Sequence, residues 1–467
     1  MVSPTIMPAN SVSGGYEIDN SLRFNDGDSP ILTRTPSSAG DTQKFTYSTW
    51  FKRSVISAEM YPFLNAGSNA ANYFRLNFES NDTISTYSIS GGSDDFEYVT
   101  TQVFRDPSAW YHLVFAVDTT NGTAANRVRF YINGSEITSF STENNPSQNL
   151  STDVNGTTAH YIGRRTPGND SFYDGYLAET HLVDGAQKAP TDFGETDDNG
   201  VWIPKAYDGS YGTNGYYLEY KETGTSQNSS GIGADTSGND HHWAVTNFAA
   251  IDVTTDTPTN NFATMNPLLG KAASFTFSEG NTYIDGNNGG VAITTSTIAP
   301  NNGKWYAEVK MISNNNQKWR AGVRRVTLSD NTGNEGIIVD RAGYIYSFGT
   351  EGNSTLTDFT SSPGAITQNQ IIGIAMDLDS GTKTVSFFED GTALGSANTL
   401  DIDEEYVFFC HDYSTSGEDT PVYSWNFGQP NFSISSGNAD AEGHGNFEFA
   451  PPSGFFALCT KNLAEYG

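Results

Sequence analysis

Apolar and polar residues alternate along much of the chain, in short runs bounded by Gly, Asn, Asp and Pro. In residues 127–132, for example, Val128, Phe130 and Ile132 alternate with two arginines and a tyrosine, so a strand there has one apolar and one polar face. No window of about 12 residues has the apolar spacing of an amphipathic helix. The pattern predicts an antiparallel all-β protein, with its clearest strands at residues 45–51, 73–78, 110–117, 127–132, 159–162, 304–311, 371–376, 384–388 and 405–410.

One three-strand pattern occurs twice. Residues 113–118 (LVFAVD) and 372–377 (IGIAMD) are each followed by a Gly-containing loop, an alternating strand, a two-residue turn and a short third strand. The turns are Asn133-Gly134 and Asp390-Gly391. These residue types favour the positive φ angles of a type I′ hairpin. The repeat predicts two related β-sandwiches in series.

Low hydrophobicity marks the segment between the two copies, around residues 221–262. We therefore predict an N-terminal arm at residues 1–20, a first sandwich at 21–220, a connector with an Asp- and Asn-rich turn at 221–269, and a second sandwich at 270–467.

The net charge of the chain limits the classes of molecule that it is expected to bind. The chain of 467 residues has 54 acidic against 24 basic side chains, a formal net charge of −30, which argues against nucleic-acid binding. Aromatic residues make up 13% of the chain, which indicates a folded protein. Cys410 and Cys459 are too few for a disulfide framework and are not spaced as zinc ligands, so we expect them in a core. We expect neither an export signal nor membrane insertion, because no apolar run is long enough.

Several segments resemble known families. A resemblance to laminin G-like, concanavalin A-like jelly rolls covers about residues 1–220. It is carried by residues 21–51, the segments WYHLVFAVD and RVRFYING, and residues 172–184. Residues 303–310, 371–391 and 423–429 resemble a SPRY domain over about 270–460. The resemblance implies two antiparallel jelly-roll sandwiches in tandem, the first laminin G-like and the second SPRY-like.

The joining segments 200–220, 256–268 and 451–463 are similar to those of structural proteins of tailed, in particular marine, bacteriophages. This resemblance implies a non-enzymatic virion protein, assembled in the host cytoplasm and released by lysis. We expect a tail fibre or other appendage component, an oligomer of identical chains that contacts other virion proteins through the arm at 1–20 and binds host-surface polysaccharide or another receptor. A structural or capsid decoration protein is the alternative, and a polysaccharide-degrading enzyme is a weaker one.

Glucanases with concanavalin-like folds carry alternating acids on a strand. Asp401, Asp403 and Glu405 are the nearest match, because alternate residues of a strand share one face. The alternative, which the sequence favours, is a solvated acidic turn before the strand at 405–410. His241 and His242 make a poor chelate, because neighbouring residues of a strand point to opposite faces. We predict no catalytic residue.

Calcium is the only cofactor that the residues suggest, because carboxylate and amide oxygens are its ligands. The densest cluster contains Asp192, Asp197, Asp198 and Asn199, with Glu195 between them, and a second contains Asp235, Asn239 and Asp240. Asp and Asn side chains that cap their own turns are the alternative interpretation.

Sugar binding requires exposed aromatic rings beside planar polar side chains. The candidates are Trp319 and Tyr413, which we expect in loops, and Trp202, Tyr207 and Tyr211 in a Gly-rich segment. Core packing or a subunit contact is the alternative for each, and is favoured for Trp202.

Overall fold

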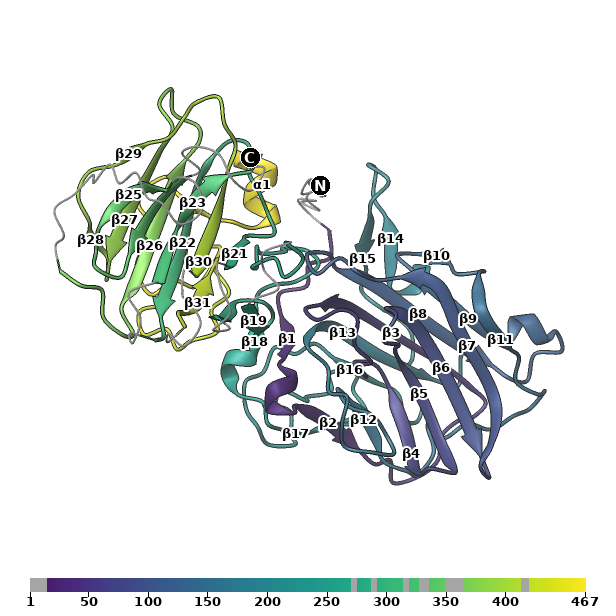
Figure 1. Ribbon diagram of the computed structural model, residues 1–467. Helices are drawn as coiled ribbons and strands as arrows, with labels where there is room; N and C mark the ends of the chain where they lie inside the picture. The colour runs from purple at the N-terminus through teal and green to yellow at the C-terminus, as the bar shows by residue number, and fades with distance from the viewer. Residues whose placement is uncertain are drawn as a thin grey trace. The chain divides into compact units, whose positions relative to one another are not determined.

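The computed structural model describes residues 15–269, 275–286, 292–313, 319–326, 336–348, 364–412 and 420–467. The chain divides between Thr259 and Asn260 into two compact units, called the first and the second unit. Figure 1 shows both as layered β-structures, the first coloured purple to teal and the second green to yellow. The fold is all-β, as predicted, and each predicted strand coincides with an observed one to within two residues at each end. Among the described residues, no helix is long and apolar enough to cross a membrane.

Two sheets of the first unit face each other. The one that contains the repeated three-strand pattern, called the meander sheet, has the order β10 (Ser135–Glu136), β9 (Val128–Ile132), β8 (Tyr111–Asp118), β3 (Lys44–Arg53), β13 (Gly175–Asp184), β1 (Ser21–Phe24) and β18 (Val253–Thr254), with β16 (Tyr216–Leu218) also paired to β13. The partner sheet has the order β11 (Phe140–Asn144), β7 (Ser93–Val103), β6 (Thr83–Ser90), β5 (Asn72–Phe78), β4 (Asn65–Asn69), β12 (His160–Ile162), β2 (Ile31–Arg34) and β17 (Ala244–Thr246).

Aromatic rings fill the space between these sheets. Phe74 of the partner sheet lies 5.9 Å, centroid to centroid, from both Phe45 and Phe115 of the meander sheet. Phe115 in turn lies 4.8 Å from Phe130. Alternation along each strand places these rings on one face, and their burial supplies the main favourable term for folding.

The second unit repeats the plan. Its meander sheet has the order β19 (Phe275–Ser278), β20 (Tyr283–Gly286), β31 (Val422–Asn426), β22 (Lys304–Met311), β26 (Ile371–Asp377), β27 (Thr384–Glu389) and β28 (Thr392–Ala393), with β29 (Asn398–Thr399) on β27 and β32 (Phe456–Ala457) on β22. Its partner sheet has the order β21 (Ala292–Thr295), β30 (Tyr406–Asp412), β23 (Trp319–Arg325), β24 (Gly336–Asp340) and β25 (Ile345–Phe348). Phe408 and Trp425 pack between the two sheets.

Few other elements occur in the described residues. A two-stranded sheet joins β14 (Gly194–Thr196) to β15 (Trp202–Pro204). The helices are α1 (Thr460–Tyr466) and the short 3-10 turns η1 (Asp26–Asp28), η2 (Ala124–Asn126), η3 (Pro190–Asp192) and η4 (Ala250–Asp252).

The predicted connector at 221–269 is wrong as a separate segment. Strands β17 and β18 pair with β2 and β1, and Trp243 is fully buried in the first core against Tyr216, so residues 221–259 belong to the first unit. Phe262 and Met265 are buried in the second unit. Three buried side chains, Ile232, Trp243 and Phe248, anchor the polar segment 221–259 in the first core, and its average hydrophobicity does not register them.

The predicted arm at 1–20 also needs correction at its end. Residues 1–14 lie outside the described residues, whereas Tyr16 and Ile18 pack against Trp50, Trp110 and Tyr176 of the first unit.

Asp401, Asp403 and Glu405 lie in the turn before β30, which confirms the acidic-turn alternative. The carboxylates of Asp401 and Glu404 lie 3.0 and 3.2 Å from the guanidinium of Arg325. The acids therefore do not form a row on a strand.

Candidate functional site

Three of the predicted sugar-binding residues lie together. Trp202, Tyr207 and Tyr211 belong to a segment that packs on the outer face of the meander sheet of the first unit, over His112 of β8 and His181 of β13. We call this segment, residues 186–217, the covering layer. It brings the predicted rings together, as a binding site would require.

Each of these rings has packing partners within the unit. Trp202 stacks on His112 and also contacts Gly134, where an added Cβ would lie 2.4 Å from its ring. The ring of Tyr207 stacks on Phe193 at 4.9 Å. Its centroid is also 5.5 Å from the ammonium group of Lys188.

Tyr211 completes the covering layer. Its ring stacks in parallel on His181 and Tyr217, with centroids at 6.0 and 6.3 Å. A sugar ring stacks on an open aromatic face. These three rings pack within the unit and are half-buried, and Trp202, Tyr207 and Tyr211 as sugar-binding residues stay a prediction.

His112 lies beneath the covering layer and is fixed as a neutral imidazole. The indole N–H of Trp202 can only donate, so Nδ1 of His112, 3.0 Å away, accepts. Nε2 then carries the proton and donates to the hydroxyl of Ser48 at 2.8 Å. Burial, and next the charge of His181, lower the pKa of His112 to about 3. The lone pair that would activate Ser48 is absent from Nε2, so the pair is not a nucleophile with its base.

A strained residue lies at the other end of the layer. Ala178 opposes Trp50 and His181 opposes Ser48, so β13 has a bulge at Glu179, whose φ is 49°. The carboxylate of Glu179 is buried and accepts hydrogen bonds from the hydroxyls of Tyr16, at 2.9 Å, and Tyr217. The bulge thus directs Glu179 to anchor the layer and the segment at Tyr16.

The remaining two aromatic candidates are Trp319 and Tyr413. Trp319 begins β23 and is 0% exposed, stacked on Tyr423 at 5.4 Å, so the expectation of a loop residue with an open ring is wrong. Tyr413 lies outside the described residues.

The predicted calcium ligands cap turns. Asp192 accepts the backbone N–H of Ala189, and Asp197 accepts those of Asn199 and Val201 at 2.9 and 2.7 Å. Asp198 is in the same turn. Within the described ranges, no three His, Cys, Asp or Glu side chains gather as a metal site would require. The turn alternative accounts for Asp192, Asp197 and Asn199, and calcium at this cluster stays a prediction.

In the second acidic cluster, the carboxylate of Asp235 also caps a turn. Asp235 accepts backbone N–H groups of Tyr217, Ser237 and His241 at 2.8 to 2.9 Å, which closes the loop around its own carboxylate.

A different surface has the chemistry of a binding site. On the outer face of the partner sheet, Tyr161 of β12 opposes Asn65 of β4. Along the same direction Arg75 of β5 opposes Tyr87 of β6, and Tyr87 opposes Glu97 of β7. Directly opposed residues point to the same side of a sheet. These side chains therefore form a row across neighbouring strands.

Two arginines in this region lie on tyrosine rings. The guanidinium of Arg75 is 4.1 Å from the ring centroid of Tyr73 and 5.7 Å from that of Tyr61. The guanidinium of Arg164 is 4.0 Å from the centroid of Tyr161. We call this surface the tyrosine–arginine face and define it by Tyr61, Tyr73, Arg75, Tyr87, Tyr161 and Arg164.

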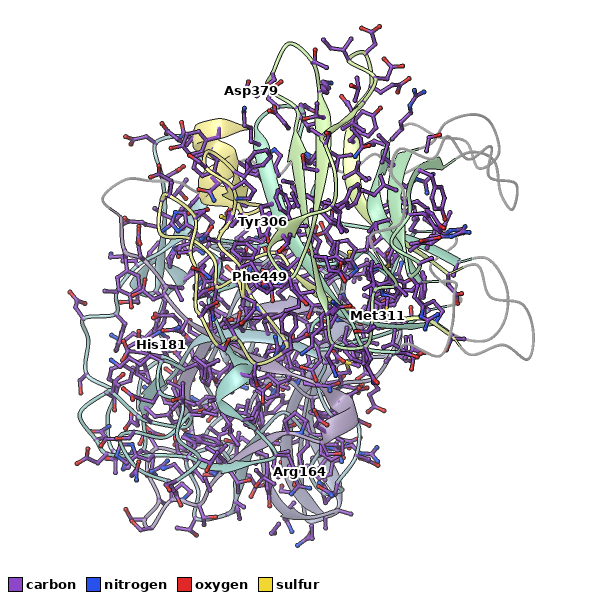
Figure 2. The ribbon with its side chains drawn as sticks, turned by 90° about the vertical axis from the view of Figure 1, so that its left-hand side faces the viewer. Arg164, His181, Tyr306, Met311, Asp379 and Phe449 are labelled. Atoms are coloured by element: carbon purple, nitrogen blue, oxygen red, sulfur yellow. The ribbon has the colours of Figure 1, made fainter. Side chains whose placement is uncertain are left out.

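Hydrogen bonds hold the face in place. Arg75 donates from Nε to the carbonyl of Thr166 at 2.6 Å, and Arg164 donates to the carbonyl of Gly168. Tyr87 donates to Glu79 at 3.1 Å. All of its defining residues except Tyr61 are half-buried, so part of each side chain meets solvent. Figure 2 labels Arg164 and His181, which lie in separate parts of the first unit.

Fixed donors beside aromatic rings can bind the hydroxyl groups and the apolar face of a sugar. Sequence reasoning missed this face, although the signal was present in YFRLNF, where Tyr73 and Arg75 alternate with the buried Phe74 and Leu76.

Comparisons with known proteins give a family match within the first unit and similarities to solved structures. Residues 25–191 match a family described as the concanavalin A-like lectin/glucanases superfamily. Among solved structures, the SPRY domain of human HERC1 is similar with a TM-score of 0.24 and 19% identity, over 31% of this chain and 87% of that chain. The native heptameric SAP-like pentraxin from Limulus polyphemus is similar with a TM-score of 0.28 and 15% identity, over 37% of this chain and 80% of that chain. A search of curated proteins gives no match. Residues 25–191 of the first unit are therefore similar to the concanavalin A-like lectin/glucanases superfamily.

Proposed function

We propose that this chain is a non-enzymatic bacteriophage virion protein, a tail fibre or other appendage component, whose first unit binds host-surface glycan or another receptor. The tyrosine–arginine face is the observation that carries the binding role. The match of residues 25–191 to a superfamily that includes lectins supports it. The assignment to a virion rests on the similarity of segments 200–220, 256–268 and 451–463 to phage structural proteins.

The chemistry of the face suits a carbohydrate. Tyr87 offers ring surface, and Tyr73 and Tyr161 add the ring surface that the guanidinium groups on them leave open. Arg75 and Glu97 offer a donor and an acceptor in the same row. Rigid β-strands hold these groups at fixed spacing, which lowers the entropy lost on binding. A sugar presents the complementary pattern of apolar C–H faces and hydroxyl edges.

A binding role without catalysis is consistent with the state of the buried polar groups. His112 has no lone pair directed at Ser48, and Glu179 is engaged by two tyrosine hydroxyls. The acids at 401–405 lie in a turn with Arg325. Each of these groups has a structural partner.

Binding of the purified full chain to polysaccharide extracted from host envelopes tests the receptor role. We expect the double variant Tyr73→Ala/Tyr87→Ala to bind about thirtyfold more weakly, since each of the two rings contributes on the order of 1 kcal/mol. Tyr344→Ala is the matched control, because this tyrosine is 39% exposed and lies in the second unit. Equal binding by all three proteins, or no binding by any, would contradict the proposal.

Mass spectrometry and immunogold labelling of purified particles test the virion role separately. The protein is expected in intact particles and on an appendage. Uniform labelling of the capsid shell, without glycan binding, would support the decoration alternative instead. Absence from particles would overturn the virion assignment.

A further inference from the structure

The charges on the tyrosine–arginine face differ from those elsewhere in this acidic chain. Acidic residues outnumber basic ones by 54 to 24, and five other arginines of the first unit have a carboxylate beside them. Arg53 lies 3.0 Å from Asp82, and Arg129 lies 2.6 Å from Glu136. Arg34 and Arg127 bind carbonyl oxygens instead, but both are buried. In the part of the chain that the structure describes, Arg75 and Arg164 form no ion pair. Both belong to the same face.

Neutral groups hold these two arginines. Carbonyls of Thr166, Pro167 and Gly168, all in the loop before β13, accept hydrogen bonds from the two guanidinium groups. Asn169 accepts a further bond from Arg164 at 3.1 Å. Carbonyl and amide acceptors orient a guanidinium without cancelling its charge. Each cation is therefore pre-oriented and retains its full charge at the surface.

Each guanidinium keeps donors for a ligand. An arginine has five N–H groups, and the bonds of Arg75 use Nε and Nη2 while those of Arg164 use Nη1. Among the described residues nothing occupies Nη1 of Arg75 or Nη2 of Arg164. A carboxylate or sulfate is the group that such paired donors recognise best.

Nearby acids restrict where an anion fits. Glu79 accepts hydrogen bonds from Ser85 and Tyr87 at 2.5 and 3.1 Å, and Glu97 lies beyond Tyr87 in the row. Glu59 accepts a hydrogen bond from Tyr61, whose ring centroid lies 5.7 Å from the guanidinium of Arg75, so a carboxylate is present near the arginines as well. A negative group on a ligand is therefore repelled near these three acids and attracted where it reaches the free Nη groups of Arg75 and Arg164.

We propose that the tyrosine–arginine face selects acidic glycans, in which a carboxylate or sulfate on the sugar binds Arg75 and Arg164 while the sugar ring contacts the tyrosines. This inference rests on the proposed glycan binding and adds the chemical class of the ligand.

Matched oligosaccharides test it with the full chain by calorimetry or biolayer interferometry. The set contains a uronate-bearing oligosaccharide, the same oligosaccharide with its carboxyl groups reduced to neutral alcohols, and a sulfated counterpart. We expect the neutral form to bind at least about tenfold more weakly, since loss of one charge-assisted contact has that effect. Binding of the charged forms is expected to weaken as salt rises.

Variants distinguish an effect of the arginine charges on binding from an effect on folding. Arg75→Gln/Arg164→Gln is expected to bind charged and neutral forms equally, while unfolding at the same temperature as the parent within a few degrees. Arg129→Gln, which removes an arginine paired with Glu136 on the meander sheet, is the control and is expected to keep the preference.

The outcomes distinguish the two proposals. Equal binding of charged and neutral oligosaccharides by the parent overturns the acidic-glycan inference and leaves glycan binding in place. No binding of any oligosaccharide overturns both. A preference for the uronate or for the sulfated form supports the inference and identifies the anionic group.

Discussion

Each of the two units contains a meander sheet of the same strand order, and the units differ in the segments that cover this sheet. In the first unit the strand order is β10-β9-β8-β3-β13-β1, and in the second it is β28-β27-β26-β22-β31-β20. Each position in one order has a counterpart in the other. The shared plan shows that the fold depends on the strand pattern, while the covering segments and outer faces distinguish the units.

The hairpins match in detail. Asn133-Gly134 has φ angles of 47° and 76°, and Asp390-Gly391 has 44° and 78°, as a type I′ turn requires. The side chain of Asn133 accepts the backbone N–H of His112 at 2.8 Å, and that of Asp390 accepts the N–H of Ile371 at 2.9 Å. The first turn residue therefore closes the meander in both units.

A salt bridge closes the opposite end of both meanders. Lys44 and Asp118 oppose each other on β3 and β8, with charged atoms 3.2 Å apart. Lys304 and Asp377 oppose each other on β22 and β26 at 2.9 Å.

The covers of the two sheets differ in chemistry. In the first unit the covering layer rests on the neutral His112, whereas in the second unit the segment at Glu448 and Phe449 covers the sheet and is held by Glu308, which is fully buried. Glu308 accepts the backbone N–H groups of Glu448 and Phe449 at 3.0 and 2.7 Å. Figure 2 shows Tyr306 and Phe449 close together in this region. One scaffold thus carries two covers with opposite proton preferences.

The largest effect is expected from the matched core positions Phe130 and Phe387. Phe130→Ala should destabilise the first unit, and Phe387→Ala the second, by about 3–5 kcal/mol each, because a buried ring leaves a cavity. Differential scanning calorimetry should show one transition shifted in each variant. A parallel shift of the whole unfolding profile in both variants would contradict the division into two units.

The second largest effect is expected from pH, which should change the stability of the two units in opposite directions. Burial raises the pKa of Glu308 from 4.5 to about 7, so the folded second unit holds a proton that the unfolded chain has released. Its free energy of unfolding should therefore fall as pH rises from 4.5 through about 7, by on the order of 3 kcal/mol.

The first unit should respond in the other direction. His112 remains neutral when folded, while the unfolded residue takes up a proton near its ordinary pKa of 6.5. Stability is therefore present above that pKa and is lost as pH falls toward 3. Thermal unfolding at a series of pH values measures both trends. The slope of the second unit should disappear in Glu308→Gln, and an unchanged slope would show that another group is responsible.

Gly134→Ala and Gly391→Ala compare the two hairpins. Positive φ alone costs an alanine about 1–2 kcal/mol. The new Cβ would also lie 2.4 Å from the ring of Trp202 in the first unit and 2.7 Å from that of Phe449 in the second. Denaturant titration should show a loss in both, with the larger loss for Gly134→Ala. No loss in either would contradict the turn assignment.

The smallest effect concerns the matched salt bridges. Lys44→Met and Lys304→Met should each cost about 0.5 kcal/mol, because both lysines are partly exposed and solvent screens the pair. Unfolding in low and high salt measures this, and the difference between parent and variant should shrink at high salt. A cost that does not change with salt would mean that the lysine stems act through packing.

The sequence predicts those features of the fold that depend on interactions between neighbouring residues. Alternating strands and Asn-Gly or Asp-Gly turns predicted the fold and the repeated meander, because these signals lie within a few neighbouring residues. The packing of Trp202 and Tyr207 could not be predicted in this way, since His112 belongs to β8 and Phe193 lies at the far end of the covering layer. Trp319 followed polar residues in sequence and yet begins a central strand.

The tyrosine–arginine face could be predicted from the sequence only in part. Tyr73 and Arg75 could be assigned outward from alternation alone, but the register that aligns Arg75 with Tyr87, and the stacking of Arg164 on Tyr161, depend on tertiary structure.

Hydrogen–deuterium exchange of the full chain, with and without a bound host glycan, tests the central claim most directly. The account predicts slower exchange in β5 and β6, residues 72–90, and in the loop at 164–170 that holds both arginines. Slower exchange confined to the covering layer at 186–217, or to residues 260–467, would contradict the assignment of glycan binding to the tyrosine–arginine face.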